Sequence, residues 1–329
     1  MTSKNIELSA QLEPLVTDVL RQFGFGSASA IRLLSFSENA VYRVDMTDGD
    51  PIVIRLHSLG YHTKQEIESE LAWIEAVRNE SEVVTAPVLR TPSGESVVSA
   101  QAEGLDSRYA VVFGYLGGRE PVAGNWISDF RLLGRTTALL HQHALKWQPP
   151  SYFTRFRWDL GGAVSANAHW GRWQNGPALN HEMVVTIDRA VELMTRRLQN
   201  FGQLENRFGL IHADFRLANV LMDDETVQVI DFDDCGFGWL LYDLAGALTF
   251  NEDDPMVPAL IENWLKGYRE VRPLSGADEA EIPSFILMRR LTLLAWLGSR
   301  PDTELFISEG PRFARVTAEL AERYLTDMS

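Results

Sequence analysis

The residues best suited to chemistry lie in two short segments of the second half of the chain. Residues 212–219 read His-Ala-Asp-Phe-Arg-Leu-Ala-Asn after a short apolar run, and residues 227–234 read Val-Gln-Val-Ile-Asp-Phe-Asp-Asp. A carboxylate such as that of Asp214 can orient an attacking hydroxyl and accept its proton. The amide oxygen of Asn219 and the carboxylate of Asp231 are the hard oxygen ligands that Mg²⁺ prefers. This spacing, with a strand that ends in Asp, predicts phosphoryl transfer from a magnesium-bound nucleotide.

Four neighbouring residues have less definite roles. Asp233 and Asp234 are candidates to cap the following turn or to face a substrate amine. His212 is interpreted as a structural residue that braces the loop, and Asp243 as a structural hydrogen-bonding residue one turn into the next helix.

The first 114 residues predict a small sheet with one helix laid across it. Apolar residues at helical spacing predict an opening helix over 6–23, which stops at two glycines. The cluster Asp48-Gly49-Asp50-Pro51 predicts a tight hairpin turn. Period-two runs predict strands over 30–36, 41–45, 52–57, 96–100 and 109–113, and a helix is expected over 64–79.

After Gly114 the pattern becomes mainly helical. Helices are expected over 129–144, 182–199, 258–271, 282–298 and 311–326, with short buried strands over 209–212, 220–222 and 227–230. The predicted fold class is therefore α+β, with a β-rich lobe (1–114) and a helical lobe (115–329); the kinase-type spacing of the two motifs adds the expectation of a bilobal, protein-kinase-like fold whose first lobe binds the nucleotide. The helical lobe would carry the catalytic loop and the acceptor site.

These motifs resemble the aminoglycoside phosphotransferase and choline kinase-like superfamily, and in particular its homoserine kinase-like and bacterial stress-response kinase branches. The resemblance extends through most of the chain. It rests on residues 211–221, 229–234 and 242–245, and on the further segments 37–44, 53–56, 70–73, 133–135 and 139–141.

The resemblance implies ATP and Mg²⁺ as cofactors and assigns a role to each matching position. Asp214 would be the catalytic residue, Asn219 and Asp231 would hold the metal, and Asp233 would be a third metal ligand. The nucleotide would be bound by Ser37, Asn39, Arg55 with its partner Glu70, and the backbone of Gly114 and Leu116. Two departures indicate a variant nucleotide site: the loop 37–40 has no glycine, and Arg55 stands where protein kinases have lysine.

Composition limits the partners and the location. The chain has 329 residues with 30 basic and 45 acidic side chains, a net charge of −15. This charge disfavours nucleic acid and anionic membrane surfaces and is compatible with an amine-bearing substrate. The single cysteine, Cys235, excludes an internal disulfide. Together with the absence of a signal-peptide pattern and of a long apolar run, this predicts a cytoplasmic protein. The sequence does not indicate an oligomeric state.

The sequence thus predicts an ATP-dependent phosphotransferase that acts on a hydroxyl of a small molecule: a hydroxy amino acid, an amino alcohol or an aminoglycoside-like compound. A protein Ser/Thr kinase of the stress-response type and a non-catalytic nucleotide-binding regulatory protein are the alternatives. The short run between Asp231 and the next helix leaves little room for a peptide-binding activation segment, which favours a small molecule.

The acceptor is predicted from charge. The Trp-rich stretch 152–173 carries Arg155, Arg157 and Arg172. If these arginines face the acceptor, they would bind a substrate carboxylate and repel a polycation. The alternative for the tryptophans is that they pack in the core. A hydroxy amino acid or a small amino alcohol is therefore expected in preference to aminoglycosides.

Overall fold

The computed structural model describes residues 3–36, 39–223 and 226–329. The chain divides into two compact units. Unit 1 comprises residues 1–118, 148–155 and 228–233, and unit 2 comprises residues 119–147, 156–227 and 234–329. The lobe boundary between residues 114 and 115 stays a prediction.

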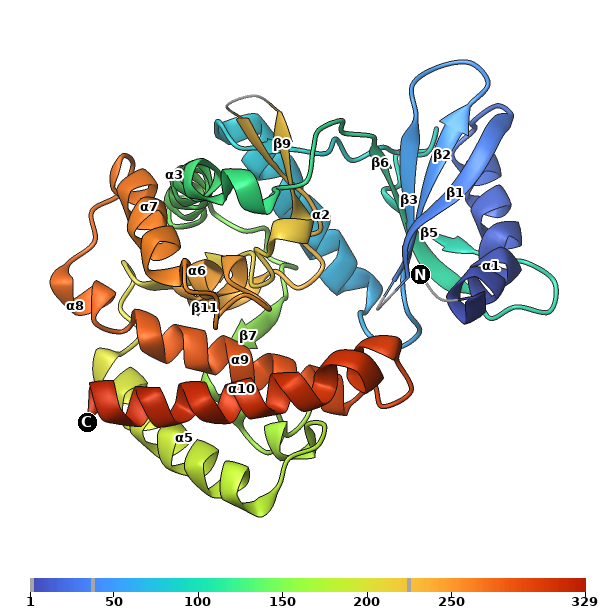
Figure 1. Ribbon diagram of the computed structural model, residues 1–329. Coiled ribbons are helices and arrows are strands. Elements are labelled where there is room, and N and C mark those ends of the chain that lie inside the picture. Colours follow the sequence, from blue (N-terminus) through green and yellow to red (C-terminus); the bar gives the residue numbers. More distant parts are fainter. Residues whose placement is uncertain (1–2, 37–38, 224–225) are drawn as a thin grey trace. The chain divides into compact units, whose positions relative to one another are not determined.

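Unit 1 is built on a five-stranded sheet with the order β1-β2-β3-β6-β5 (Figure 1). Its strands are antiparallel to their neighbours and comprise β1 (Ala28–Phe36), β2 (Ala40–Met46), β3 (Ile52–Leu56), β5 (Val97–Ala100) and β6 (Arg108–Gly114). The turn between β2 and β3 contains Gly49 at a φ of 110°, a conformation that side chains with a Cβ rarely adopt. The hairpin predicted over residues 48–51 is therefore present.

Alternation of side chains gives the sheet its buried face. In β2 every second residue is buried from Ala40 to Val44, and Tyr42 lies opposite Ile54 of β3. Helix α1 (Ser3–Gln22) lies against this sheet, as Figure 1 shows beside β1 and β5. Its buried residues share one core cluster with the strands: Leu12, Leu15, Val16, Val19 and Leu20. This packing holds β3, and with it Arg55, in a fixed position.

Helix α2 (Lys64–Glu80) begins at a complete capping box, in which the Thr63 hydroxyl accepts from the Glu66 backbone N–H and the Glu66 carboxylate accepts from the Thr63 backbone N–H. The short strand β4 (Val84–Thr85) follows it and pairs in parallel with the end of β10 (Thr226–Val229). In this way the segment that leads to Asp231 is joined to unit 1.

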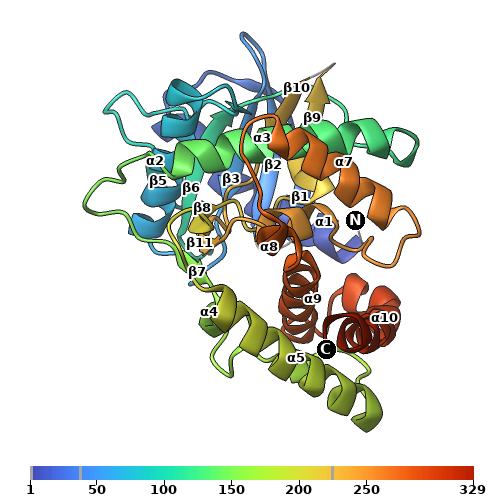
Figure 2. The same ribbon diagram turned by 90° about the vertical axis from the view of Figure 1, so that its left-hand side faces the viewer.

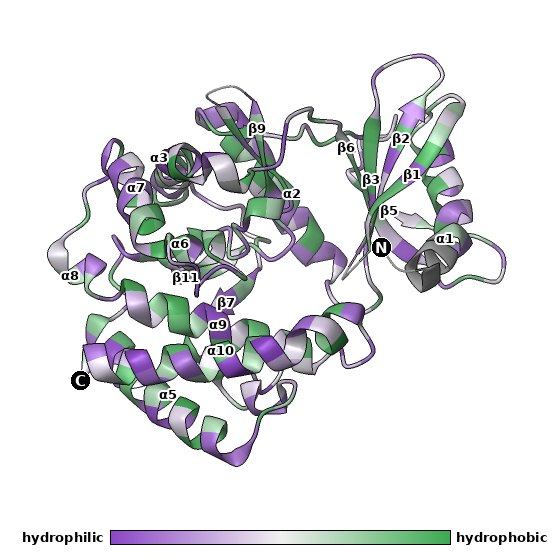
Figure 3. Cartoon of the chain, viewed as in Figure 1, coloured by the Kyte–Doolittle hydropathy of each residue, from purple (hydrophilic) through white to green (hydrophobic). Residues whose placement is uncertain are grey.

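Unit 2 is mostly helical. Its helices are α3 (Trp126–Ala144), α4 (Leu160–Val164), α5 (His181–Phe201), α6 (Tyr242–Ala247), α7 (Val257–Arg269), α8 (Gly276–Glu279), α9 (Ile282–Gly298) and α10 (Glu304–Met328), with 3₁₀ turns at Ala123–Asn125, Trp173–Asn175 and Leu217–Asn219. Figure 2 shows α3 beside α7, and α9 beside α10 with α5 below them. Figure 3 shows hydrophilic and hydrophobic residues alternating along α5 and α10, as expected for helices with one buried face.

A small sheet of order β7-β11-β8 lies next to the catalytic loop. It consists of β7 (Phe156–Trp158), β11 (Gly236–Trp239) and β8 (Phe208–Ile211), and β9 (Val220–Asp223) follows the loop. β8 ends directly before His212, so that the sheet fixes where the loop begins. Among residues 3–36, 39–223 and 226–329, no helix has the length and apolar character needed to cross a membrane.

Candidate active site

In unit 1 the predicted pair of Arg55 and Glu70 is formed. Arg55 Nη2 of β3 lies 2.6 Å from Glu70 Oε2 of α2, and both side chains are buried. Arg55 Nη1 also lies 3.4 Å from Oδ1 of Asp231. Burial alone would lower the pKa of Arg55, but the charges of Glu70, Asp233 and Asp231 raise it above its ordinary value. Arg55 is therefore a fixed cation that links β3, α2 and the segment after β10.

Asp231 retains an accessible carboxylate. Its side chain is 40% exposed although its ion-pair partner Arg55 is buried, and its backbone has a φ of 60°. This left-handed conformation is uncommon for a residue with a Cβ and is maintained where the surrounding structure requires it. An exposed carboxylate held by a buried cation fits the donor chemistry of a magnesium ligand.

Asp233, two residues further on, is enclosed instead. Its Oδ2 accepts a hydrogen bond of 2.8 Å from Asn39 Nδ2, and its Oδ1 lies 3.5 Å from His57 Nδ1 and 3.8 Å from Arg55 Nη1. The carbonyl oxygen of Asp233 is contacted by His62 Nε2 and accepts from Arg155 Nη2. Burial raises the pKa of Asp233, but Arg55, His62 and His57 outweigh it and hold the pKa well below its usual range.

These contacts bear on three predicted residues. Oδ2 of Asp233 accepts the hydrogen bond from Asn39, whereas Oδ1 has only the longer charge contacts with His57 and Arg55 and no hydrogen-bond partner among the described residues, so the metal role of Asp233 stays a prediction. Asn39 also binds inward, since its Oδ1 accepts from the Ser58 N–H at 3.1 Å. Ser37, predicted to bind nucleotide, lies outside the described residues.

The segment after β6 contains the residues predicted to bind adenine. The Gly114 N–H donates to the Pro87 carbonyl oxygen at 2.9 Å, so that this donor is already occupied. A Cβ at Gly114 would lie 2.6 Å from Pro87 Cγ, which explains the glycine. Roles for the Gly114 carbonyl and the Leu116 backbone in nucleotide binding stay predictions.

In unit 2 the loop after β8 is held in place by Asp243 of α6. Its two carboxylate oxygens accept from the backbone N–H groups of His212 (3.0 Å) and Ala213 (2.8 Å), and His141 Nε2 of α3 lies 3.0 Å from Oδ2. Ala213 adopts a φ of 65°, which this carboxylate helps to maintain. The structural role predicted for Asp243 agrees with these contacts, and His212 is fully buried beside Phe215.

Asp214, the predicted catalytic residue, is surrounded by donors. Its Oδ2 accepts from Asn219 Nδ2 at 2.7 Å and from Arg216 Nε at 3.1 Å, and its Oδ1 accepts from Arg289 Nη2 of α9. Burial raises the pKa of Asp214, but Arg216, Arg289 and His212 together lower it below its ordinary value. Asp214 is thus an ionised hydrogen-bond acceptor. The Asn219 amide nitrogen is engaged by Asp214, so its amide oxygen is the atom suited to a metal.

In the Trp-rich segment, tryptophans pack in the core and two of the arginines lie on the surface. Trp158 packs against Trp170 and stacks on Tyr242 with centroids 5.1 and 6.4 Å away, which agrees with the alternative that these tryptophans belong to the core. Arg157 is 54% exposed and pairs with Asp159, and Arg172 is also exposed. Arg155 belongs to unit 1 and binds the Asp233 and Glu66 carbonyl oxygens. Arg155 is therefore occupied by backbone carbonyl oxygens, whereas a carboxylate-binding role for Arg157 and Arg172 stays a prediction.

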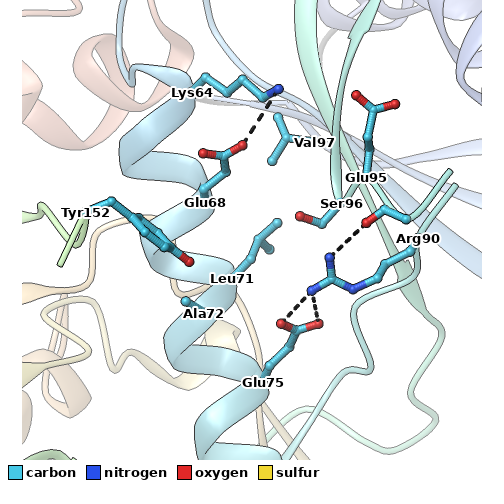
Figure 4. A pocket seen from close by; sticks show the side chains of 11 residues that line it. Lys64, Glu68, Leu71, Ala72, Glu75, Arg90, Glu95, Ser96, Val97 and Tyr152 are labelled. Carbon is cyan, nitrogen blue, oxygen red and sulfur yellow. Dashed lines mark hydrogen bonds and ion pairs between the residues drawn. The ribbon is translucent and has the colours of Figure 1, made fainter. Parts of the chain in front are cut away.

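A cavity of about 320 Å³ in unit 1 lies apart from these residues. Figure 4 shows it on the face of α2 that carries Glu68, Leu71 and Glu75, with the Glu75–Arg90 ion pair at one side. Arg55, Glu70 and Asp231 do not line it. In the part of the chain that the structure describes, no three His, Cys, Asp or Glu side chains are grouped as a metal site.

The chain is similar to known phosphotransferases. A model of the phosphotransferase enzyme family matches residues 30–274. A solved structure of a microcompartment-associated aminopropanol kinase is 39% identical, with a TM-score of 0.86 over 94% of this chain and 98% of that chain. A complex of amicoumacin kinase with AMP-PNP and Ca²⁺ has the same fold at 18% identity, with a TM-score of 0.77 over 97% and 96% of the two chains. The homoserine kinase of Methylobacillus flagellatus is 36% identical over 130 residues, 37% of each chain. The predicted α+β kinase-like fold is confirmed.

Sequence reasoning missed three residues of these clusters: Arg289, His57 and His62. Arg289 lies 75 residues from Asp214 along the chain, in a helix whose residues are otherwise mostly apolar. A signal was present, because two consecutive arginines interrupt an apolar helix that would otherwise read as core. The histidines gave no such signal, since nothing local links residues 57 and 62 to residue 233.

Proposed function

This chain belongs to the phosphotransferase enzyme family, and from that premise we propose that its acceptor is a small amino alcohol. The protein is a kinase that uses ATP and a divalent metal ion to phosphorylate a small-molecule hydroxyl. The observation that carries the proposed acceptor is the 39% identity to an aminopropanol kinase over nearly the whole of both chains.

The charges within unit 2 support the same class of acceptor. Arg155 is buried in unit 1 and pairs with backbone carbonyl oxygens, so it gives no reason to prefer a hydroxy amino acid. Arg216 and Arg289 flank Asp214 and disfavour a polycationic aminoglycoside there. A small molecule with one hydroxyl and one ammonium group is repelled less, because it carries a single positive charge.

We assign the ammonium group to Asp234. The Asp234 carbonyl oxygen accepts from Trp158 Nε1 at 2.7 Å, which fixes its backbone. Burial lowers the pKa of Arg289, but Asp214, Tyr242 and Asp234 raise it above its ordinary value, so the charge of Asp234 acts on the same cluster as that of Asp214. An acid near the reacting hydroxyl suits an acceptor whose amine lies two carbons from that hydroxyl.

The residues then have these proposed roles. Asp214 accepts a hydrogen bond from the acceptor hydroxyl and takes its proton as the acceptor oxygen bonds to the γ-phosphorus, while the bond from that phosphorus to the β–γ bridging oxygen breaks and ADP leaves. Asn219 and Asp231 would hold the metal, which neutralises charge on the phosphates when it is bound. Arg55, fixed by Glu70, would contact the nucleotide phosphates. A cytoplasmic location, supported by the single buried Cys235, is part of the same proposal.

A coupled assay of ADP release tests the acceptor. We expect the highest kcat/KM for a small amino alcohol such as 1-amino-2-propanol, with lower values for homoserine and for an aminoglycoside. Asp214→Asn is the control, and we expect it to lower kcat by about 10²–10⁴-fold while ATP binding persists. A higher kcat/KM for an aminoglycoside or for homoserine would refute the proposed acceptor. Phosphorylation of proteins alone would assign the chain to the protein kinase alternative.

A further inference from the structure

The middle of α9 places two arginines side by side in the interior of unit 2. Arg289 and Arg290 are each 1% exposed, in a helix whose other buried residues are almost all apolar. A buried guanidinium is stable only when it is paired and hydrogen-bonded. The acidic partner of each arginine therefore shows which part of the structure that arginine stabilises.

Arg290 has a partner far from the catalytic loop. Its Nη1 donates to Glu252, its Nε to Thr317 Oγ1 at 3.0 Å, and its Nη2 to the Phe313 carbonyl oxygen at 3.1 Å. These contacts join α9 to α10 and to the segment before α7. Arg290 is a structural ion pair.

Arg289 is bound to the catalytic loop itself. Its Nη2 donates to Asp214 Oδ1, its Nη1 to the Ala213 carbonyl oxygen at 3.2 Å, and its Nε to Thr249 Oγ1 at 3.2 Å. Its guanidinium carbon lies 5.9 Å from the ring centroids of both Trp170 and Tyr242. The planar group is thus fixed by aromatic rings and by three acceptors at once.

The acceptor sites of the Asp214 carboxylate indicate the role of its contact with Arg289. A carboxylate has about four acceptor sites, two on each oxygen. Asn219 and Arg216 both donate to Oδ2, and Arg289 donates to Oδ1. The remaining acceptor site belongs to Oδ1, the oxygen that Arg289 holds. Arg216 is 36% exposed on its own loop, whereas the Arg289 side chain is 2% exposed, so Arg289 is the rigid anchor.

We propose that Arg289 is a positioning residue for phosphoryl transfer: from α9 it fixes the Asp214 carboxylate and the Ala213 peptide so that Oδ1 presents its open acceptor site to the substrate hydroxyl. The inference rests on the proposed role of Asp214. Arg289 also acts on the backbone of Ala213, which has a φ of 65°. Arg289 binds the Ala213 carbonyl oxygen, and Asp243 accepts from the Ala213 N–H. Loss of Arg289 frees both the side chain and the peptide that carries it.

Two pairs of variants test this: Arg289→Lys with Arg290→Lys, and Arg289→Met with Arg290→Met. A lysine keeps the charge but has no planar fork with which to reach three acceptors. We expect Arg289→Lys to lower kcat by about 10–100-fold, because misplacement of a reacting group by about 1 Å costs that much. The KM for ATP and for the acceptor should change by less than about threefold, because a positioning effect acts on kcat. Arg289→Met should lose more activity than Arg289→Lys, and both Arg290 variants should keep kcat while melting at a lower temperature.

Crystal structures of the same variants give a readout that needs no acceptor. We expect the Asp214 carboxylate to adopt a new or a divided conformation in the Arg289 variants and to keep its place in the Arg290 variants. If the wild-type enzyme turns over none of the amino alcohols, the proposed function fails while these structures still decide the positioning role. An Asp214 that keeps its place in the Arg289 variants, or an Arg289→Met enzyme whose kcat equals that of Arg290→Met, would overturn the inference. If Arg289→Met does not fold, Arg289→Lys carries both measurements.

Discussion

Asp231 and Asp233 stand two residues apart on one segment of unit 1 and have opposite surroundings. The side chain of Asp231 is 40% exposed, whereas that of Asp233 is 7% exposed and lies among Asn39, His57 and Arg55. Because successive side chains of an extended segment point in opposite directions, residues two apart would normally face the same way. The positive φ of Asp231 breaks that pattern, which allows one acid to face outward and the other inward.

Substitution of the two aspartates should therefore affect different properties. Asp231→Asn removes an accessible carboxylate, so we expect weaker Mg²⁺-dependent ATP binding in calorimetry and a nearly unchanged melting temperature. Asp233→Asn removes the buried negative charge that lies 3.8 Å from Arg55, which then keeps only Glu70 as a buried counter-charge, so we expect it to cost about 1–3 kcal/mol of stability. Each variant is the control for the other. Loss of metal dependence in Asp233→Asn without a loss of stability would support the metal role that the sequence predicted for Asp233.

At the acceptor, Asp234→Asn should change substrate binding selectively. We expect KM for an amino alcohol to rise by about tenfold or more, because a hydrogen bond between charged groups contributes about 1.5–3 kcal/mol. A diol of the same length that lacks the amine should show the same KM with wild type and variant. Equal effects on both acceptors would show that Asp234 does not bind the ammonium group.

Among the elements, the crossing of α3 and α7 depends on two glycines that face each other's helix. A Cβ at Gly134 of α3 would lie 1.9 Å from the Trp264 carbonyl oxygen, and a Cβ at Gly267 of α7 would lie 1.8 Å from that of Arg131. The obstacle in each case is backbone, which a side-chain rotation cannot relieve. α3 also carries His141, which contacts Asp243 beneath the catalytic loop.

We therefore expect Gly134→Ala to destabilise the protein by about 1–3 kcal/mol or more, the usual cost of overpacking. It should also lower kcat, because separation of α3 from α7 moves His141. Gly276→Ala is the matched control, since a Cβ at Gly276 meets no atom within 4 Å. Thermal unfolding of the two variants measures the effect, and equal midpoints would contradict the close approach.

Most of the main elements could be predicted because their signals are local. The helix expected over 282–298 is present over those residues, and the strand expected over 52–57 is present as Ile52–Leu56. The helix expected over 311–326 begins earlier, at Glu304, because Thr303 caps it and Pro311 lies within it instead of at its start. The strands β7 and β11 were not predicted. Each has only three or four residues, and they are stabilised by pairing with each other at Phe156–Gly236 rather than by their own composition.

In the candidate site, too, features with local signals could be predicted and contacts between distant segments could not. The spacing of Asp214, Asn219 and Asp231 is visible in the sequence, because it lies within two short segments. The distant partners of Asp214 and of the neighbouring Asp233 are not visible, since Arg289 and His57 lie in other elements and only folding brings them there. The orientation of Arg155, Arg157 and Arg172 was likewise beyond the sequence, because exposed and buried arginines have the same local pattern.

For the whole molecule, buried histidines make stability depend on pH. Burial, reinforced by Arg55, lowers the pKa of His57 well below its ordinary value, and burial also lowers the pKa of His141. In the unfolded chain both would take up a proton near pH 6.5, the ordinary value for histidine. As the pH falls below about 6.5 the unfolded state therefore binds more protons, and the free energy of unfolding decreases by up to about 1.4 kcal/mol per pH unit for each histidine.

Denaturant unfolding at pH 7.5, 6.5 and 5.5 measures this effect, with the expected loss confined to the interval below about pH 6.5. The carboxylates of Asp214 and Asp233 do not contribute in that interval. Their pKa values are lowered by folding, so their stabilisation is lost only below about pH 4. His57→Gln should reduce the slope. A free energy of unfolding that stays constant or rises between pH 6.5 and 5.5 would contradict the neutral state of both histidines.

The aromatic side chains are distributed unevenly between the two units. Of the nine tryptophans in the sequence, Trp73 alone belongs to unit 1. It is fully buried on α2, and its ring lies edge-on to Phe232, the residue between Asp231 and Asp233, with centroids 5.3 Å apart. In protein labelled with fluorotryptophan, the ¹⁹F resonance that disappears in Trp73→Phe is therefore a single-site signal for the Asp-Phe-Asp segment, and its shift on addition of nucleotide or magnesium reports on that segment directly.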